Sequence, residues 1–213
     1  MNVRELKPRL WYWTARHPDW TADQGGEGGW EPDVGCYAYV APDLRALVLI
    51  DALVPGGDAD SFWEALDDDV AHHGPPNVLV TVDWHARSAQ AILDRYEGAR
   101  VWAYAPAREE LGKRTTITDV FELGDSLPAG IEAHDAGGSD HEVAYRVPEY
   151  AAIVVGDSMI APPGGVPRVW PDEDSVRPAL RALLDHPVEL LLLTHGEPVL
   201  AEGGAALARA LEE

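Results

Sequence analysis

Cysteine, lysine and long apolar runs are all scarce in this chain. The 213 residues include 1 cysteine, which excludes an intrachain disulfide and any multi-cysteine zinc site. That residue, Cys36, lies in the apolar stretch GCYAYVA, which favours a buried, inert thiol over a nucleophile. A run of about 18 apolar residues, as a membrane helix needs, is missing. The polar N-terminal segment MNVRELKPR also lacks the apolar core of a signal peptide. We therefore expect a cytoplasmic, soluble protein.

Positive charge is scarce as well. Lysine and arginine together number 16 against 37 aspartates and glutamates, which gives a formal net charge of −21. Such a surface repels phosphate backbones and anionic lipid, so we expect no nucleic-acid partner and no membrane partner. The partner that remains to be expected is a small-molecule substrate or ligand. The apolar content of 46% is ordinary for a globular protein, and the length predicts a single domain over residues 1–213.

The order of the expected elements indicates an α/β protein with two sheets. Aromatic and branched segments between turn formers predict strands at 10–14, 36–41, 46–53, 77–82, 99–104, 117–123, 130–136, 142–147, 151–157 and 188–194. Apolar residues at helical spacing predict helices at 58–73, 86–98, 172–186 and 202–213. Strands occur in both halves of the chain. We expect one sheet to contain 46–51 and 77–82 and the other 151–156 and 188–193, packed face to face between helical layers.

Five motifs follow one another along the chain: VLIDAL, VLVTVDWHARSAQAI, IEAHDAGGSDHEVAYRV, AIVVGDSMI and LLLTHGEP. In their order and spacing they resemble the metallo-β-lactamase superfamily over nearly the whole chain. The resemblance implies a four-layer αββα sandwich, of the α/β (α+β) class. It also implies one or two metal ions, usually zinc, at one edge of the sheets. Most members of that superfamily are hydrolases, although a fold does not fix a function.

The principal metal-binding motif of the family is altered in this chain. That motif reads Thr-His-x-His-x-Asp-His and follows a buried strand. The matching register places Asp83 at the first His, His85 at the second, Arg87 at the Asp and Ser88 at the last His. Only His85 therefore keeps its family ligand, with Asp83 as a candidate substitute for another.

The remaining family ligands are partly retained. The His of a Pro-Gly-His stretch corresponds to Gly138, and His141 lies three residues further on as a candidate replacement. The Asp that bridges two metals in the family corresponds to Asp157, and the last His corresponds to His195. The resemblance thus leaves His85, Asp157 and His195 as the metal ligands.

Arg87 argues against the usual two-metal site. An arginine stays protonated and is never a ligand, and its charge repels a divalent cation. We predict that its guanidinium forms a bidentate pair with Asp157, which would occupy the oxygens that bridge two metals.

Two hypotheses for the function remain open. The first is a mononuclear metal-dependent hydrolase of a small ester, lactone or other acyl substrate. Two His with one or two carboxylates and an open water position suit zinc, iron or manganese. Asp83 would then be a ligand or the base that orients water, and Arg87 would clamp a substrate carboxylate or stabilise an oxyanion. The second is a non-catalytic, metal-free member that binds a ligand or a partner.

Tryptophan is abundant, with 8 residues, and four of them lie near the N-terminus. Trp11 and Trp13 share one face of their strand, which favours core packing. Trp20 and Trp30 flank a glycine-rich loop. They are either core residues or the lining of a hydrophobic pocket for an aromatic or acyl substrate.

Overall fold

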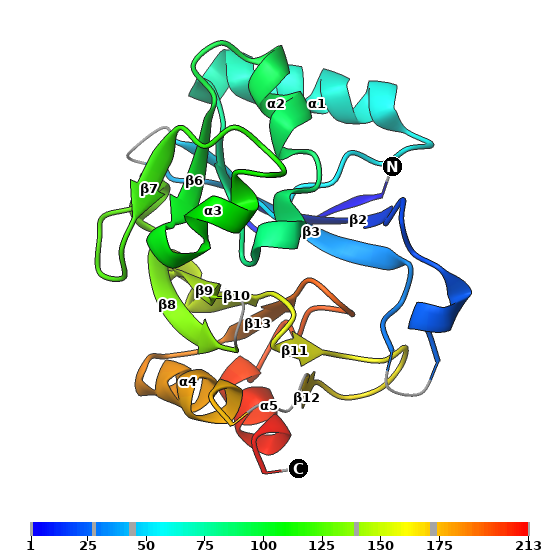
Figure 1. The fold of residues 1–213 in the computed structure, drawn as a ribbon, viewed down its shortest axis with the longest axis vertical. Coiled ribbons are helices and arrows are strands. Elements are labelled where there is room, and N and C mark those ends of the chain that lie inside the picture. The colour runs from blue at the N-terminus through cyan, green and yellow to red at the C-terminus, as the bar shows by residue number, and fades with distance from the viewer. Residues whose placement is uncertain (1, 27–28, 43–45, 139–140, 171–173, 213) are drawn as a thin grey trace.

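Two β-sheets packed against each other form the centre of the molecule, with helices on both outer faces (Figure 1). The computed structural model describes residues 2–26, 29–42, 46–138, 141–170 and 174–212. Within these ranges, none of the helices has the length and apolar character needed to cross a membrane. The layers run helix, sheet, sheet, helix, which confirms the expected αββα sandwich.

The first sheet has the strand order β1-β2-β3-β4-β5-β6-β7. Neighbouring strands are antiparallel from β1 to β4 and parallel from β4 to β7. Parallel neighbours need crossover connections, and the helices α1 (Ala59–His73), α2 (Ala89–Arg95) and α3 (Arg108–Leu111) lie in these connections. The strands are β1 (Val3–Lys7), β2 (Leu10–Arg16), β3 (Asp33–Val40), β4 (Leu47–Ile50), β5 (Asn77–Leu79), β6 (Arg100–Tyr104) and β7 (Asp119–Phe121).

The second sheet has the strand order β13-β10-β9-β8. Its strands are β8 (Glu132–Gly137), β9 (Glu142–Val147), β10 (Ala152–Val155) and β13 (Leu190–Leu193). Strands β8, β9 and β10 are antiparallel, whereas β10 and β13 are parallel. Helices α4 (Val176–Ala182) and α5 (Gly203–Ala210) cover its outer face, and β11 (Met159–Ile160) pairs separately with β12 (Arg168–Val169).

One hydrophobic core lies between the two sheets. It contains Tyr37, Ile50 and Leu79 from the first sheet and Val154 and Leu192 from the second, all fully buried. Each such side chain contributes roughly 1.5–3 kcal/mol of burial free energy, so face-to-face packing fixes the two sheets relative to each other. The sheet assignments expected for 46–51, 77–82, 151–156 and 188–193 are confirmed by β4, β5, β10 and β13.

The connection from β5 to α2 differs from the expected strand and helix. The strand ends at Leu79, a short 3₁₀ helix η2 (Asp83–Ala86) follows, and α2 begins only at Ala89. Arg87 has a φ of 40°, in a region that non-glycine residues rarely adopt, and this interrupts the helical path between η2 and α2. The junction is therefore a turn that holds its side chains over the sheet edge.

The carboxyl ends of β10 and β13 are adjacent at that same edge. Val155 and Leu193 are paired in the parallel ladder, and Asp157 and His195 each follow two residues later. The hydroxyl of Tyr37, from the first sheet, donates to the carbonyl oxygen of Leu193 at 2.6 Å. This bond joins the two sheets beside the loop ends, so the loops are held by rigid elements.

Candidate metal centre

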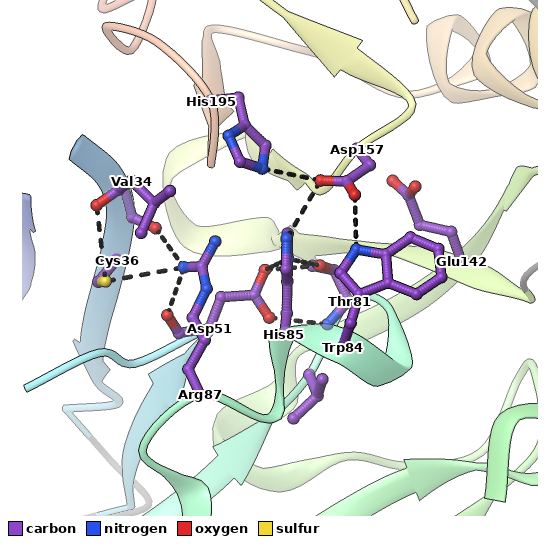
Figure 2. Close-up of polar contacts among 12 residues, drawn as sticks. Val34, Cys36, Asp51, Thr81, Trp84, His85, Arg87, Glu142, Asp157 and His195 are labelled. Atoms are coloured by element: carbon purple, nitrogen blue, oxygen red, sulfur yellow. Dashed lines mark hydrogen bonds and ion pairs between the residues drawn. The ribbon is translucent and has the colours of Figure 1, made fainter. Parts of the chain in front are cut away.

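The three side chains that the family resemblance gives as metal ligands lie together at this edge, each from a separate loop. Nε2 of His85 lies 3.1 Å from Oδ1 of Asp157, and Nε2 of His195 lies 2.9 Å from the same oxygen (Figure 2). One ligand atom from each residue lies within 4.8 Å of the other two. The residues come from η2 and from the turns after β10 and β13.

Two of the three spacings between the candidate ligand atoms suit a cation. A tetrahedral zinc ion with ligands at about 2.0–2.1 Å has its ligand atoms about 3.3 Å apart, close to the two distances from Asp157 to the imidazoles. Oδ1 of Asp157 is buried and has no hydrogen-bond partner among the described residues. Both imidazole nitrogens lie at ion-pair distance from this oxygen. Two imidazoles and one carboxylate form a donor set that zinc, iron and manganese accept.

His85 is held by a buried carboxylate behind it. Its Nδ1 lies 2.9 Å from Oδ2 of Asp51, which is fully buried. The backbone N–H of Thr81 donates to Oδ1 of Asp51 at 2.8 Å, and the Thr81 hydroxyl donates to Oδ2 at 2.5 Å. With Nδ1–H donating to Asp51, Nε2 is the nitrogen that faces Asp157. A carboxylate behind a histidine is the usual way to orient an imidazole for a metal.

The charges at the centre are strongly coupled. Burial and the charge of Arg87 oppose protonation of His85, but Asp157 and Asp51 outweigh them and raise the pKa of His85 to about 9. Burial raises the pKa of Asp157, but the charge of His85 and the contact with His195 outweigh it, so this pKa lies well below its usual range. Burial lowers the pKa of His195. Without a metal, His85 is therefore charged at neutral pH and His195 is neutral.

The turn that carries Asp157 is fixed by hydrogen bonds to Glu142 and by close packing at Gly156. Both carboxylate oxygens of Glu142 accept from the backbone N–H of Ser158, at 3.1 and 2.9 Å, and Oε1 also accepts from the Ser158 hydroxyl at 2.8 Å. A Cβ at Gly156 would lie 2.5 Å from Oγ1 of Thr81 and 3.0 Å from Oε1 of Glu142, so only glycine fits there. Burial, together with the nearby charge of Asp157, raises the pKa of Glu142 to about 8.

The predicted pair between Arg87 and Asp157 is wrong. Nη1 of Arg87 donates to the backbone carbonyl oxygens of Gly35 at 2.9 Å and Asp51 at 2.7 Å, and it also contacts Sγ of Cys36 at 3.8 Å. Figure 2 shows the guanidinium on the side of His85 that faces away from Asp157. The strained backbone of Arg87 directs its side chain toward the ends of β3 and β4, where these carbonyls are nearer than the carboxylate.

The other altered positions also have partners elsewhere. Oδ2 of Asp83 accepts from Nε of Arg114 at 2.9 Å, and Asp83 is not in the group of residues whose ligand atoms converge. The hydroxyl of Ser88 accepts from the backbone N–H of Val54 at 2.9 Å. His141 is exposed and is not among the residues that line the cavity next to the centre.

A cavity of about 460 Å³ opens onto the centre. Aromatic rings form much of its wall, namely Trp30, Trp84 and Trp170. Trp30 meets the ring of His195 edge-on, with the ring centroids 4.9 Å apart. Trp30 therefore lines a pocket, whereas Trp20 lies outside this lining and donates its indole N–H to the carbonyl oxygen of Trp30 at 3.0 Å.

The expectations for the core residues are confirmed. Trp13 is buried in the core between the first sheet and α1, and Trp11 packs against the same core but is only partly buried. The thiol of Cys36 is fully buried, and burial raises its pKa to about 11, which leaves it protonated and unreactive at neutral pH.

Sequence reasoning missed two residues of the centre. Asp51 ends the apolar run of the VLIDAL motif, and a carboxylate at the end of a buried strand is a signal that was available. Trp84 is the second residue that was missed. Its indole N–H donates to Oδ2 of Asp157 at 2.6 Å, which no sequence pattern indicates.

Solved structures with the same architecture are numerous. A metallo-β-lactamase from Pontibacter korlensis is 12% identical, with a TM-score of 0.71 over 100% of this chain and 99% of that one. The mono-zinc form of the metallo-β-lactamase FIM-1 from Pseudomonas aeruginosa is 14% identical, with a TM-score of 0.69 over 99% and 94%. A metal-soaked flavodiiron core from Synechocystis is 15% identical, with a TM-score of 0.72 over 99% and 60%.

Sequence comparison adds no relative. No family model matches this chain, and no curated protein matches it. At 12–15% identity the structural likeness establishes the architecture and not the activity. The chain has the metallo-β-lactamase fold.

Proposed function

We propose that this protein is a one-metal hydrolase of a small acyl compound such as an ester or a lactone. The observation that carries the proposal is the convergence of His85, His195 and Asp157 on one point, with Asp51 orienting His85 from behind. Three protein ligands and an open position form a common catalytic arrangement for zinc. The identity of the metal, zinc or else iron or manganese, is part of the proposal.

A divalent ion bound here would activate a water molecule and polarise a substrate carbonyl. The chain's own residues supply the frame for this chemistry. Asp51 and Thr81 fix the tautomer and the direction of His85. Trp30 packs against His195 and excludes water from one side of its ring. Asp83 is paired with Arg114, so it is not part of the proposed ligand set.

The cavity supports the choice of a small acyl substrate. Its volume of about 460 Å³ suits a compact molecule, and its three tryptophan rings suit an apolar or aromatic acyl group. Arg87 and Arg114 also line it. These two cations are the candidates for stabilising negative charge that develops on the substrate.

Metal analysis of protein purified without chelator, together with a panel of chromogenic esters and lactones, tests the proposal. We expect about one ion per chain, and we expect His85→Ala and His195→Ala to lose both the ion and the hydrolysis. His141→Ala is the matched control, because His141 is exposed and outside the cavity lining. Protein without metal, or hydrolysis that survives both variants, would contradict the proposal.

A second candidate function is that of a metal-free ligand-binding module. The observation in its favour is the charge balance at the centre, where His85 is flanked by Asp51 at 2.9 Å and Asp157 at 3.1 Å. A protonated imidazole between two carboxylates balances the negative charge at the centre, so no metal ion is needed for that purpose. This candidate predicts that chelator-treated protein binds small apolar acids or esters in the cavity as tightly as untreated protein does, with no turnover.

A further inference from the structure

We propose that Trp84 is a positioning residue that leaves Asp157 only one oxygen for a metal, and so limits the centre to one ion. The inference rests on the proposed one-metal function and specifies how that centre is built. It concerns the carboxylate that bridges two metals in the family pattern. Here the two oxygens of that carboxylate have different surroundings.

The two oxygens of Asp157 face different partners (Figure 2). Oδ1 lies 3.1 Å from Nε2 of His85 and 2.9 Å from Nε2 of His195, and it accepts no hydrogen bond from the described residues. Oδ2 accepts the indole N–H of Trp84 at 2.6 Å. An indole nitrogen is a donor only, and its bond to an ionised carboxylate is of the stronger, charge-assisted kind. Oδ1 is therefore the oxygen left for a cation.

Packing alone does not fix the direction of the Trp84 indole N–H. The residue is 36% exposed, so about two thirds of its surface is buried and apolar contacts help to hold the ring. Those contacts do not require the N–H to face a carboxylate, whereas the bond to Asp157 does. Trp84 precedes His85 in η2, so one short turn delivers a metal ligand and fixes the orientation of a second ligand from the opposite sheet.

The surroundings of Trp84 agree with a one-ion centre. At the two family positions that hold the second metal, Ser88 accepts from the backbone N–H of Val54 and Arg87 donates to two backbone carbonyls. With Oδ2 of Asp157 bonded to Trp84, and with His85, His195 and Oδ1 of Asp157 all ligands of the first ion, this group of residues has no ligand left for a second ion. The indole N–H thus stands where a second cation would otherwise bind the carboxylate.

Cobalt(II) titration of Trp84→Phe tests the inference, because phenylalanine keeps an aromatic ring and removes the donor. We expect about 10–100-fold weaker cobalt and zinc binding, the usual effect of losing a residue that orients a ligand. We also expect weaker visible cobalt absorption, because the freed carboxylate can bind through both oxygens and raise the coordination number. Trp170→Phe is the matched control. Trp170 lines the same cavity and has no hydrogen bond to Asp157 in the described part of the chain, so we expect it to behave as wild type.

The inference is overturned if Trp84→Phe matches Trp170→Phe in cobalt affinity and spectrum. A wild-type protein that binds neither cobalt nor zinc contradicts the proposed function instead. In that case, or if Trp84→Phe does not fold, the bond between Trp84 and Asp157 is tested by NMR through the indole N–H resonance of Trp84 in the metal-free protein. We expect it to shift more in Asp157→Asn than in Asp83→Asn, and equal shifts would overturn the inference.

Discussion

Replacing Asp51 by asparagine should weaken both the fold and the metal site. Asp51 is fully buried and accepts from the Thr81 backbone, the Thr81 hydroxyl and Nδ1–H of His85. Asparagine keeps one acceptor oxygen but removes the charge and places an N–H₂ group against the imidazole or the hydroxyl. Removing one partner of a buried ion pair costs about 3–5 kcal/mol, because the other charge is left uncompensated. The charge that loses a partner here is that of His85, which keeps Asp157 but lies near the guanidinium of Arg87, so we expect the lower end of this range.

The sign of the pH effect follows from the carboxylate. Burial raises the pKa of Asp51, but the charge and hydrogen bond of His85 outweigh burial, so its pKa is lowered in the folded protein. A lowered acid pKa contributes stability that is present above the unfolded pKa and lost as the pH falls through the folded pKa. Asp51→Asn should therefore reduce the free energy of unfolding most at neutral pH and least in acid.

Urea unfolding of chelator-treated protein and zinc titration of untreated protein measure the two effects. Zinc affinity should fall about 10–100-fold, because the imidazole no longer has a carboxylate to fix its tautomer. The matched control is Asp119→Asn, which removes a carboxylate paired with Arg100 at 3.1 Å on the surface. Exposed pairs contribute about 0–1 kcal/mol. If Asp51→Asn were no more destabilising than Asp119→Asn and left zinc affinity unchanged, the role assigned to Asp51 would be refuted.

Three further variants test the packing around the centre. The pKa of Glu142 is raised to about 8, so between about pH 4.5 and 8 the folded state holds a proton that the unfolded state has lost, and stability falls as the pH rises. Glu142→Gln should flatten that decline in urea unfolding. An unchanged slope would contradict the raised pKa of Glu142. Arg87→Ala removes charged hydrogen bonds to the carbonyl oxygens at Gly35 and Asp51, which should cost about 1.5–3 kcal/mol by the same assay, whereas a neutral effect would mean that water replaces them. Gly35→Ala places a Cβ 2.7 Å from the carbonyl oxygen at the end of β13 and should destabilise by about 1–3 kcal/mol in thermal unfolding. Gly56→Ala, which meets open space, should not, and equal melting temperatures for these two variants would contradict the close approach.

The architecture could be predicted because burial leaves a strong pattern in the sequence. The runs that form β4, β10 and β13 are apolar at every position, as strands covered on both faces are. The strand β1 was not expected, because its residues Val3–Lys7 are mostly polar and only partly buried at the sheet edge. Such an edge strand is specified by its partner β2 rather than by its own composition.

The convergence of the three candidate ligands could be predicted for a different reason. His85, Asp157 and His195 follow buried strands, and strand ends that share a sheet edge bring distant residues together. The partners of Arg87 could not be predicted, since they are backbone carbonyls of residues 36 and 52 positions away in sequence. Backbone acceptors occur at every residue, so composition gives no signal for them. The role of Asp83 was likewise hidden, because its partner Arg114 lies 31 residues away.

The altered ligand positions are not random losses. Asp83, Arg87 and Ser88 each form a defined hydrogen bond or ion pair, and none of these bonds uses an atom of Asp157 or His195. A site that had merely decayed would be expected to fill with apolar side chains or to collapse, because buried polar groups without partners are costly. Here each new partner lies outside the gap between the imidazoles. The three altered residues therefore leave Asp157 as the carboxylate between His85 and His195, next to a cavity of about 460 Å³, which agrees with the proposed single ion.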